Sequence, residues 1–196
     1  MKFLSLLSLL ALFSGTVYAA DAPSNEYGFY FKPYVGADYD FIHADYKDGG
    51  DQVANDSLNG GDIHIGARVQ KYLGFEASYL WTADATKDNV LGSGLNTKVN
   101  VQGGALDAMG YLPIGNSKFE LIGTAGVSRL KAKLSLDGLI SASGSEWETK
   151  GRIGGGAQYW LTDNINLRGI VRYQGANFSG ALSNAIIYSA GLNFQF

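Results

Sequence analysis

The 196-residue sequence contains no cysteine, only three prolines and only two histidines. Without cysteine the chain can form neither a disulfide nor a thiolate nucleophile. It also lacks an apolar run of about eighteen residues, the length that a transmembrane helix needs. The formal net charge of −3 is small and of mixed sign, which does not indicate nucleic-acid binding. These absences exclude disulfide-stapled scaffolds, helical membrane proteins and proteins with a basic nucleic-acid surface.

Glycine and aromatic residues are abundant instead, with 27 Gly, 12 Tyr and 10 Phe. This composition, without a collagen period, favours β-structure with close-packed small positions and aromatic girdles at a membrane interface. The hydrophobic fraction of 46% is ordinary. It fits a membrane barrel all the same, because only every second strand residue meets lipid. The chain length indicates one domain.

The last thirteen residues, 184–196, alternate with a period of two. Side chains alternate between the two faces of a strand, so one face of this segment is continuously apolar. A soluble strand of about five or six residues does not need such a stripe, whereas a tilted membrane strand needs about nine to eleven residues. We therefore predict the closing strand of an outer-membrane barrel, whose apolar face carries Ile186, Tyr188, Ala190, Leu192, Phe194 and Phe196.

The first residues have the pattern of a secretory signal peptide. Lys2 provides a basic start, residues 3–13 are almost entirely apolar, and Val17 to Ala19 form a small-residue cleavage site. We predict a signal peptide at residues 1–19, a flexible lead at 20–26 and the outer-membrane β-barrel domain at 27–196. An uncleaved anchor is the alternative reading of the N-terminal segment.

Period-two alternation recurs in eight segments, and long connections alternate with short ones. This pattern predicts an all-β fold: an eight-stranded antiparallel up-and-down transmembrane β-barrel, with short periplasmic turns and long outside loops. An even number of strands places both termini in the periplasm. The predicted long loops are residues 43–61, 82–95, 131–145 and 175–183, and the predicted short connections are residues 71–74, 113–117 and 161–164.

The fourth predicted strand is ambiguous in register. Val99 and Val101 share one face, whereas Leu106 and Ala108 have the opposite parity. We expect a bulge at Gly103-Gly104 that shifts the register by one residue.

Aromatic residues gather at both ends of the predicted strands, which indicates two interfacial girdles. Alternation alone does not exclude a soluble lipocalin-like barrel or β-sandwich, whose apolar faces point inward. The signal peptide, the terminal Phe196 and the girdles favour the membrane barrel. The girdle toward the long loops comprises Tyr39, Phe41, Tyr79, Trp81, Trp147 and Tyr173, and the other Phe29, Phe31, Phe75, Phe119, Tyr159, Phe194 and Phe196.

Three segments resemble the transmembrane barrel of the OmpA-like small outer-membrane proteins: Val35 to Ala37, Trp160 to Arg168 and Leu192 to Phe196. The resemblance covers essentially the whole mature chain. It implies that Phe194 and Phe196 belong to the signal that the barrel-assembly machinery reads. No periplasmic peptidoglycan-binding domain follows the predicted barrel, so we expect no tethering role of the kind such a domain gives larger relatives.

Charged side chains are predicted on the inward face of the barrel. An eight-stranded barrel is just wide enough to be filled by side chains, and buried charges need partners. The turn at residues 71–74 places Arg68 opposite Glu76, so we predict that pair, with Arg168 and Glu120 at similar depth. The predicted lumen holds Lys32, Asp38, Asp40, Arg68, Glu76, Glu120, Glu148, Lys150, Arg152, Arg168 and Arg172.

This charge network has two readings. It is a rigid polar plug, as is usual for barrels of this strand number, or it is a gate. The resemblance to OmpA-like barrels makes the gate a candidate, in which a re-paired arginine opens a narrow water path.

Catalysis and metal binding are not expected. A lipid-modifying barrel enzyme would need a histidine with a serine or an acid on the lipid-facing wall. His43 lies at a predicted strand–loop junction, His64 faces the lumen, and Ser189 has no histidine nearby in sequence. The acidic first loop offers carboxylates of the kind calcium prefers, but their spacing does not match an EF-hand. We predict no metal and no cofactor.

Three functions follow from this reading, for a protein in the outer membrane of a Gram-negative-type bacterium. The first is a structural and surface-binding barrel that displays four loops to host or surface ligands, as an adhesin does. The second is a narrow channel for ions or small solutes. The third is an outer-membrane lipid-modifying enzyme. The predicted partners are outer-membrane lipid, the assembly machinery and surface ligands, without nucleic acid.

Overall fold

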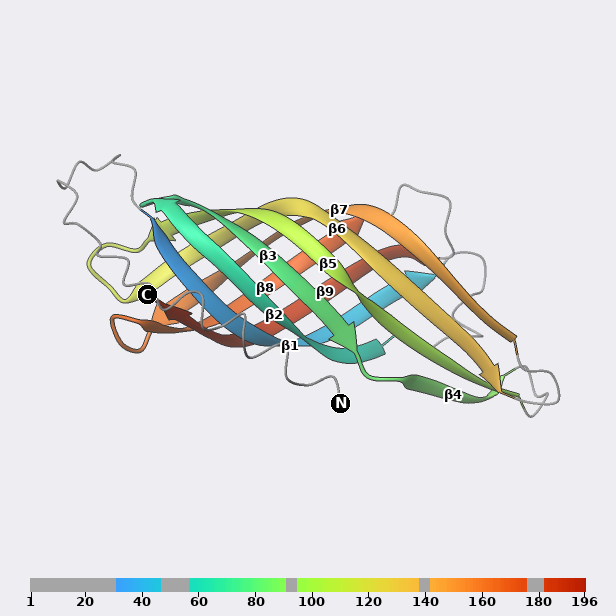
Figure 1. Ribbon diagram of the computed structural model, residues 1–196. Coiled ribbons are helices and arrows are strands. Elements are labelled where there is room, and N and C mark those ends of the chain that lie inside the picture. The colour runs from blue at the N-terminus through green and yellow to red at the C-terminus, as the bar shows by residue number, and fades with distance from the viewer. Residues whose placement is uncertain (1–30, 47–56, 91–94, 138–141, 176–181) are drawn as a thin grey trace, which may run out of the picture.

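The computed structural model describes residues 31–46, 57–90, 95–137, 142–175 and 182–196, which form a single antiparallel sheet closed into a barrel (Figure 1). The sheet order is β3-β2-β1-β9-β8-β7-β6-β5-β4, and β3 also pairs with β5, which closes the barrel. The strands are β1 (Lys32–Tyr46), β2 (Ser57–Gln70), β3 (Leu73–Thr82), β4 (Ala85–Val90), β5 (Leu95–Pro113), β6 (Phe119–Asp137), β7 (Ala142–Trp160), β8 (Ile165–Gly175) and β9 (Leu182–Gln195).

The wall has eight strands, because β4 continues β3. β3 pairs with β5 from Gln102 to Gly110, and after the break at Ala83 and Asp84 β4 pairs with the earlier part of β5. This confirms the predicted eight-stranded, all-antiparallel barrel. Among the described residues, no helix is long and apolar enough to cross a membrane. The predicted signal peptide and lead lie outside the described residues.

Three neighbouring strands are much longer than predicted. β5, β6 and β7 each contain 19 residues, whereas a membrane crossing needs about nine to eleven. Figure 1 shows β4 and the adjoining ends of β5, β6 and β7 extending beyond the other strands at one end. Strand structure therefore occupies most of the predicted loop at 131–145 and parts of those at 43–61 and 82–95. Polar sequence misled the prediction there, because a hairpin outside the membrane needs no apolar stripe.

Short turns join the strands at the opposite end, which we call the turn end. They lie at Lys71-Tyr72, at residues 114–118 and at residues 161–164, close to the predicted positions. Gly115 adopts a φ of 55° in the second turn, a left-handed conformation that glycine adopts at little cost. The other end, at which β1 is joined to β2, β4 to β5, β6 to β7 and β8 to β9, we call the loop end.

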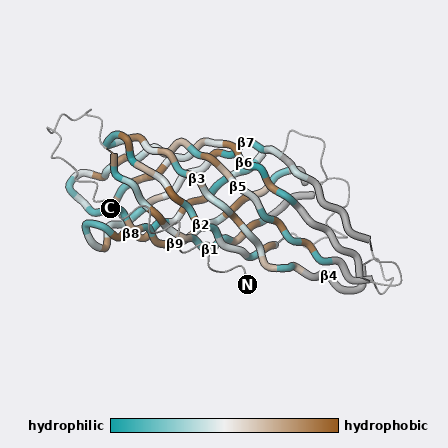
Figure 2. The backbone as a smooth tube through the Cα atoms, in the orientation of Figure 1, coloured by the Kyte–Doolittle hydropathy of each residue, from teal (hydrophilic) through white to brown (hydrophobic). Residues whose placement is uncertain are grey.

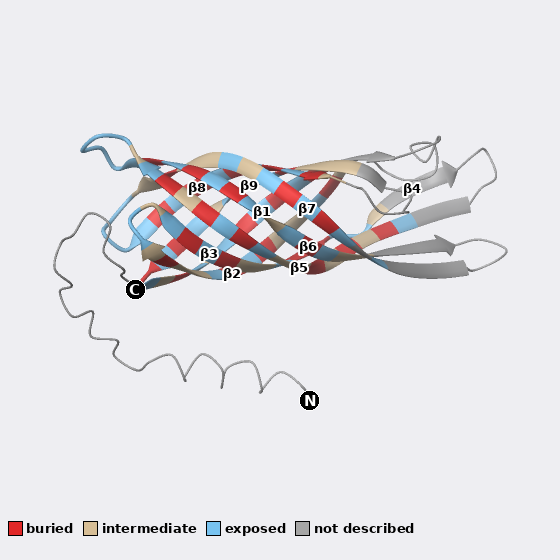
Figure 3. Ribbon diagram, turned by 90° about the horizontal axis from the view of Figure 1, so that it is seen from above, coloured by how far each residue is buried: buried red, intermediate tan, exposed pale blue. Residues whose placement is uncertain are grey.

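Exposed and buried residues alternate along the strands (Figure 3), and the hydropathy of the chain alternates with them (Figure 2). In β8, for example, Leu167 is 48% exposed while Arg168 is 2% exposed. The apolar face therefore points outward, as in a membrane barrel and opposite to a soluble one. The described aromatics of the predicted girdles are exposed, except Tyr159, which is half-buried and packs on Phe119.

The closing strand β9 has the predicted stripe. Tyr188, Leu192 and Phe194 are exposed, and β9 pairs with β1 and β8 to close the cylinder. Pro33 in β1 causes no bulge: it lies opposite Ala67, and its carbonyl accepts the backbone N–H of Phe196.

The predicted bulge in β5 is wrong. The pairing of β5 with both β3 and β6 runs without a register shift through Gly103 and Gly104. Val99 and Val101 are buried in the lumen, whereas Leu106 is 63% exposed. The prediction failed because it assumed that every apolar strand residue faces lipid, and two valines here face inward.

Candidate functional site

The barrel interior is organised around Arg168, which β8 projects inward between Leu167 and Gly169. Its Nε and Nη2 donate to both carboxylate oxygens of Asp38 on β1 at 2.6–3.1 Å. Its Nη1 donates to Glu76 on β3 at 2.5 Å. All three side chains are buried. One guanidinium thus joins three strands, and its two carboxylate partners offset the cost of burying the charge.

Further polar groups complete this central cluster. Arg172, which is the second inward residue after Arg168 on β8, donates to Glu76 and to Ser189. The Tyr34 hydroxyl also donates to Glu76, at 3.0 Å. His64 on β2 has its Nδ1 2.8 Å from Asp62, and its Nε2 2.5 Å from the side-chain oxygen of Asn193. These contacts fix the orientation of the central side chains from five strands.

A second cluster lies toward the turn end. Arg68 donates to both carboxylate oxygens of Glu120, and its guanidinium lies 3.8 Å from the centroid of the Tyr111 ring. Glu120 also accepts from Gln158 and from the indole N–H of Trp160. The bidentate geometry and the ring contact hold both charges in fixed positions.

A third cluster joins β7 to β5. Arg152 donates through Nε and Nη2 to Asp107, and through Nη2 also to Ser78 at 3.2 Å. On β9, the Ser189 hydroxyl, which accepts from Arg172 of the central cluster, donates to Asp40 of β1 at 2.5 Å. Asp107 was missed in the sequence, because the expected bulge obscured which residues of β5 face inward.

The buried charges of the described residues nearly balance. Six carboxylates face five arginines and lysines, together with His64. The carboxylates are Asp38, Asp40, Asp62, Glu76, Asp107 and Glu120, and the cations are Arg68, Lys150, Arg152, Arg168 and Arg172.

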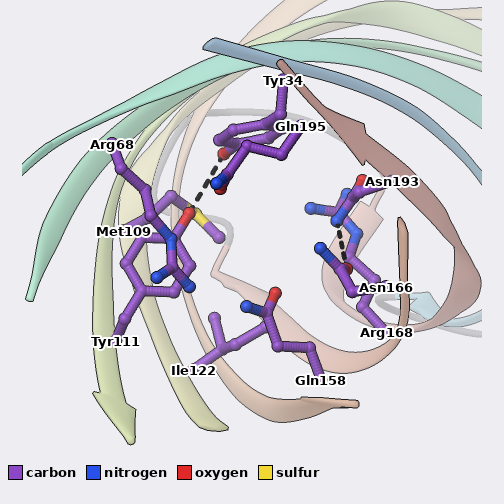
Figure 4. Close-up of a pocket in the computed structure, with 10 residues that line it drawn as sticks. All are labelled: Tyr34, Arg68, Met109, Tyr111, Ile122, Gln158, Asn166, Arg168, Asn193 and Gln195. Carbon is purple, nitrogen blue, oxygen red and sulfur yellow. Dashed lines mark hydrogen bonds between the residues drawn. The ribbon is translucent and has the colours of Figure 1, made fainter. Parts of the chain in front are cut away.

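A small cavity lies between the central and turn-end clusters, lined by the ten side chains of Figure 4. Its volume of about 10 Å³ leaves room for about one water molecule. Met109 and Ile122 line it together with Tyr34 and Tyr111. The interior at this level is therefore packed with side chains.

Toward the loop end the interior becomes apolar. Six buried aliphatic side chains from five strands pack together there, and Ala85, Leu130 and Ala185 pack against them. Sequence reasoning missed this cluster, because it expected an inward face made of polar residues. Its members are Ile42, Leu58, Leu80, Val99, Val101 and Ile187, which we call the apolar cluster.

The positions of the predicted charge-network residues agree with the prediction better than their pairing does. Arg68, Glu76, Glu120, Arg152, Arg168 and Arg172 are all buried inside, but the predicted partners differ. Arg68 binds Glu120, and Glu76 binds Arg168 and Arg172. The cause is side-chain length, since a long guanidinium reaches across the lumen rather than to the adjacent strand. Lys32 lies on the inward face of β1, opposite Arg68, but it is exposed at the turn end.

One group of potential metal ligands occurs among the described side chains. Ligand atoms of Asp38, Asp62 and His64 lie within 4.8 Å of one another. Arg168 donates to both oxygens of Asp38 and lies 3.0 Å from Nδ1 of His64. A guanidinium therefore occupies the position that a cation would take, and the group is explained by ion pairing.

The fold is similar to that of several solved outer-membrane proteins. Neisserial surface protein A is similar in structure, with a TM-score of 0.59 and 20% identity over 84% of this chain and 97% of that chain. Ail of Yersinia pestis, solved with the heparin analogue sucrose octasulfate, has a TM-score of 0.55 and 15% identity over 85% and 97%. OprG of Pseudomonas aeruginosa has a TM-score of 0.54 and 14% identity over 86% and 97%.

These likenesses agree on the fold of small outer-membrane barrels. No curated protein sequence matches the chain. The model of the family described as outer membrane protein beta-barrel domain matches residues 5–196. That match spans nearly the whole sequence, and the chain therefore belongs to the outer membrane protein beta-barrel domain family.

Proposed function

We propose that this protein is a structural and surface-binding barrel, with both termini in the periplasm and its four loop-end connections outside the cell. The observation that carries the proposal is the filled lumen. Ion-paired clusters occupy its centre and turn end, and the apolar cluster occupies the loop end. An interior packed in this way offers little space for a solute, so the outer surface is where a ligand would bind.

The rigid wall supports this role. Residues from five strands hold one another through Arg168 and its neighbours, and continuous pairing extends β5 to β7 well past the length of a membrane crossing. A rigid scaffold that carries variable connections is a common arrangement for binding. The structure of Ail with a heparin analogue gives the class of ligand to test first, a sulfated sugar.

The test is attachment of a non-adherent bacterium that displays the full-length protein to heparin-coated and cell-coated surfaces. Replacing residues 47–56, 91–94, 138–141 and 176–181 with Gly-Ser segments of equal length should abolish attachment while the barrel still folds. Attachment that is unchanged after all four replacements, or absent from the wild-type protein on both surfaces, would overturn the surface-binding role.

A narrow channel is the second candidate, and one observation favours it. Four buried polar atoms of the described residues have no hydrogen-bond partner in the protein: Oδ2 of Asp40, Oγ1 of Thr124, Nε of Arg172 and Oε1 of Gln174. Groups of this kind bind internal water, and a chain of waters beside the ion pairs would conduct ions. Steady conductance of the wild-type protein in a planar bilayer would establish this reading instead.

A further inference from the structure

Two cations and a tryptophan meet on the outer face of the barrel wall. Arg129 and Lys131 lie on β6, and Trp147 lies on β7. The guanidinium carbon of Arg129 is 5.4 Å from the centroid of the indole ring, and Nζ of Lys131 is 5.7 Å from it. We call these three residues the basic patch. Among the side chains that the structure describes, no carboxylate pairs with either cation.

The height of the basic patch follows from the outward residues of β6. From Phe119 to Val127 these residues are apolar or glycine, and the segment is nine residues long. This is the length that a tilted strand needs to cross the hydrocarbon core. Arg129 is the next outward residue. The patch therefore begins where the hydrocarbon ends, at the level of the lipid headgroups on the loop-end side.

Pairing across the sheet identifies the neighbours of the patch along the wall. Trp81 of β3 lies opposite Gln102 of β5, Gln102 lies opposite Lys131, and Lys131 lies opposite Trp147. One line of residue pairs across the wall thus begins and ends with an exposed tryptophan. Tryptophan favours the membrane–water interface, because its ring is apolar and its N–H is polar.

The opposite wall differs at the corresponding level. There Val171 of β8, Tyr188 of β9 and Phe41 of β1 form one line of outward residues. The next line toward the loop end consists of Tyr173, Ile186 and His43. Neither line contains a lysine or an arginine. The two cations of the basic patch therefore have no counterpart in these two lines of the described wall.

We propose that the basic patch binds the phosphate groups of an anionic lipid in the leaflet at the loop end. Arginine and lysine form charge-assisted hydrogen bonds with phosphate oxygens, and cations at a membrane surface attract anionic lipids. The Trp147 ring between the two cations restricts their positions and packs against the upper part of the acyl chains. The outer-leaflet assignment of the lipid rests on the orientation given under the proposed function.

The test is a titration of the full-length mature protein in neutral detergent micelles with diphosphoryl lipid A, followed by native mass spectrometry. Removing both charges in Arg129→Gln/Lys131→Gln should weaken binding about thirtyfold, the combined effect of two cations at a headgroup surface. The charge-preserving variant Arg129→Lys/Lys131→Arg should bind within about twofold of the wild type. Monophosphoryl lipid A should bind the wild type more weakly than diphosphoryl lipid A.

The matched control is Lys71→Gln/Lys118→Gln, which removes two cations at the turn end and should bind like the wild type. Equal binding by the wild type and Arg129→Gln/Lys131→Gln would overturn the proposal, as would an equal loss in the control. Micelles have no sides, so the outcome does not depend on the orientation or on the proposed attachment function. Resistance to unfolding by detergent at room temperature confirms that each variant remains a barrel.

Discussion

The two parts of the lumen are filled by different means. Around Arg168 and Arg68 the interior is held by buried ion pairs from several strands. Toward the loop end the interior holds the aliphatic side chains of the apolar cluster. Ion pairs are strongly directional and leave costly unpaired charges when broken, whereas aliphatic packing loses free energy in proportion to the volume removed. The two parts should therefore respond differently to substitution and to salt.

The difference also bears on permeability. A network of ion pairs is polar, so water can enter it when a pair breaks. Aliphatic side chains exclude water and raise a barrier to ions even without a tight contact. We therefore predict that the apolar cluster is a second seal, independent of the ion pairs.

The largest effect is expected from Arg168→Ala. Asp38 and Glu76 are fully buried beside Arg168, and the substitution leaves both carboxylates without their main partner. We expect the free energy of unfolding to fall by about 3–5 kcal/mol, measured by urea titration of the barrel in lipid vesicles. Lys118→Ala, at an exposed turn, should change it by less than about 0.5 kcal/mol. A loss below about 1 kcal/mol for Arg168→Ala would mean that the central ion pairs do not hold the barrel.

The second largest effect compares an inward-facing residue of the apolar cluster with its outward-facing neighbour. Ile187 is buried in the lumen, and its neighbour Ile186 points outward and is half-buried. Ile187→Ala should cost about 2–4 kcal/mol because it opens a cavity, and Ile186→Ala should cost clearly less because lipid can fill the space. The same urea titration gives both values. Equal losses would contradict the inward packing of Ile187.

The smallest effect tests which acid Arg68 binds. In a double-mutant cycle, Arg68→Ala with Glu120→Ala should show a coupling free energy of about 1–3 kcal/mol. The cycle of Arg68→Ala with Glu76→Ala should show much less, because Glu76 is bound by Arg168 and Arg172. A larger coupling free energy with Glu76 than with Glu120 would instead support the Arg68–Glu76 pair that strand spacing alone predicts.

The sequence predicted the barrel well because alternation determines which face each residue occupies. The outward stripe of β9, the inward positions of Arg168 and Arg172 and the turn after Gln70 all follow from a period of two. The ends of β5 to β7 could not be predicted in this way. Outside the membrane both faces of a hairpin can be polar, so the alternation disappears while the pairing continues.

The partners within the lumen were harder to predict than the faces. Spacing across a turn identifies neighbours on adjacent strands, but Arg168 reaches across the interior from β8 to Glu76 on β3. Those contacts depend on the diameter of the barrel and on side-chain length. The apolar cluster shows the same limit. Val99 and Val101 are apolar and could face lipid, and only the register of β5 shows that they face the lumen.

The account rests most on the claim that two independent seals close the lumen. The measurement that tests it most directly is single-channel conductance in a planar bilayer of four forms: wild type, Arg168→Ala, Leu80→Ser/Ile187→Ser, and all three substitutions together. We predict no steady conductance for the first three and discrete conductance steps for the fourth. Steady conductance of the wild type, or full opening by Arg168→Ala alone, would contradict the two-seal account and favour a gated pore.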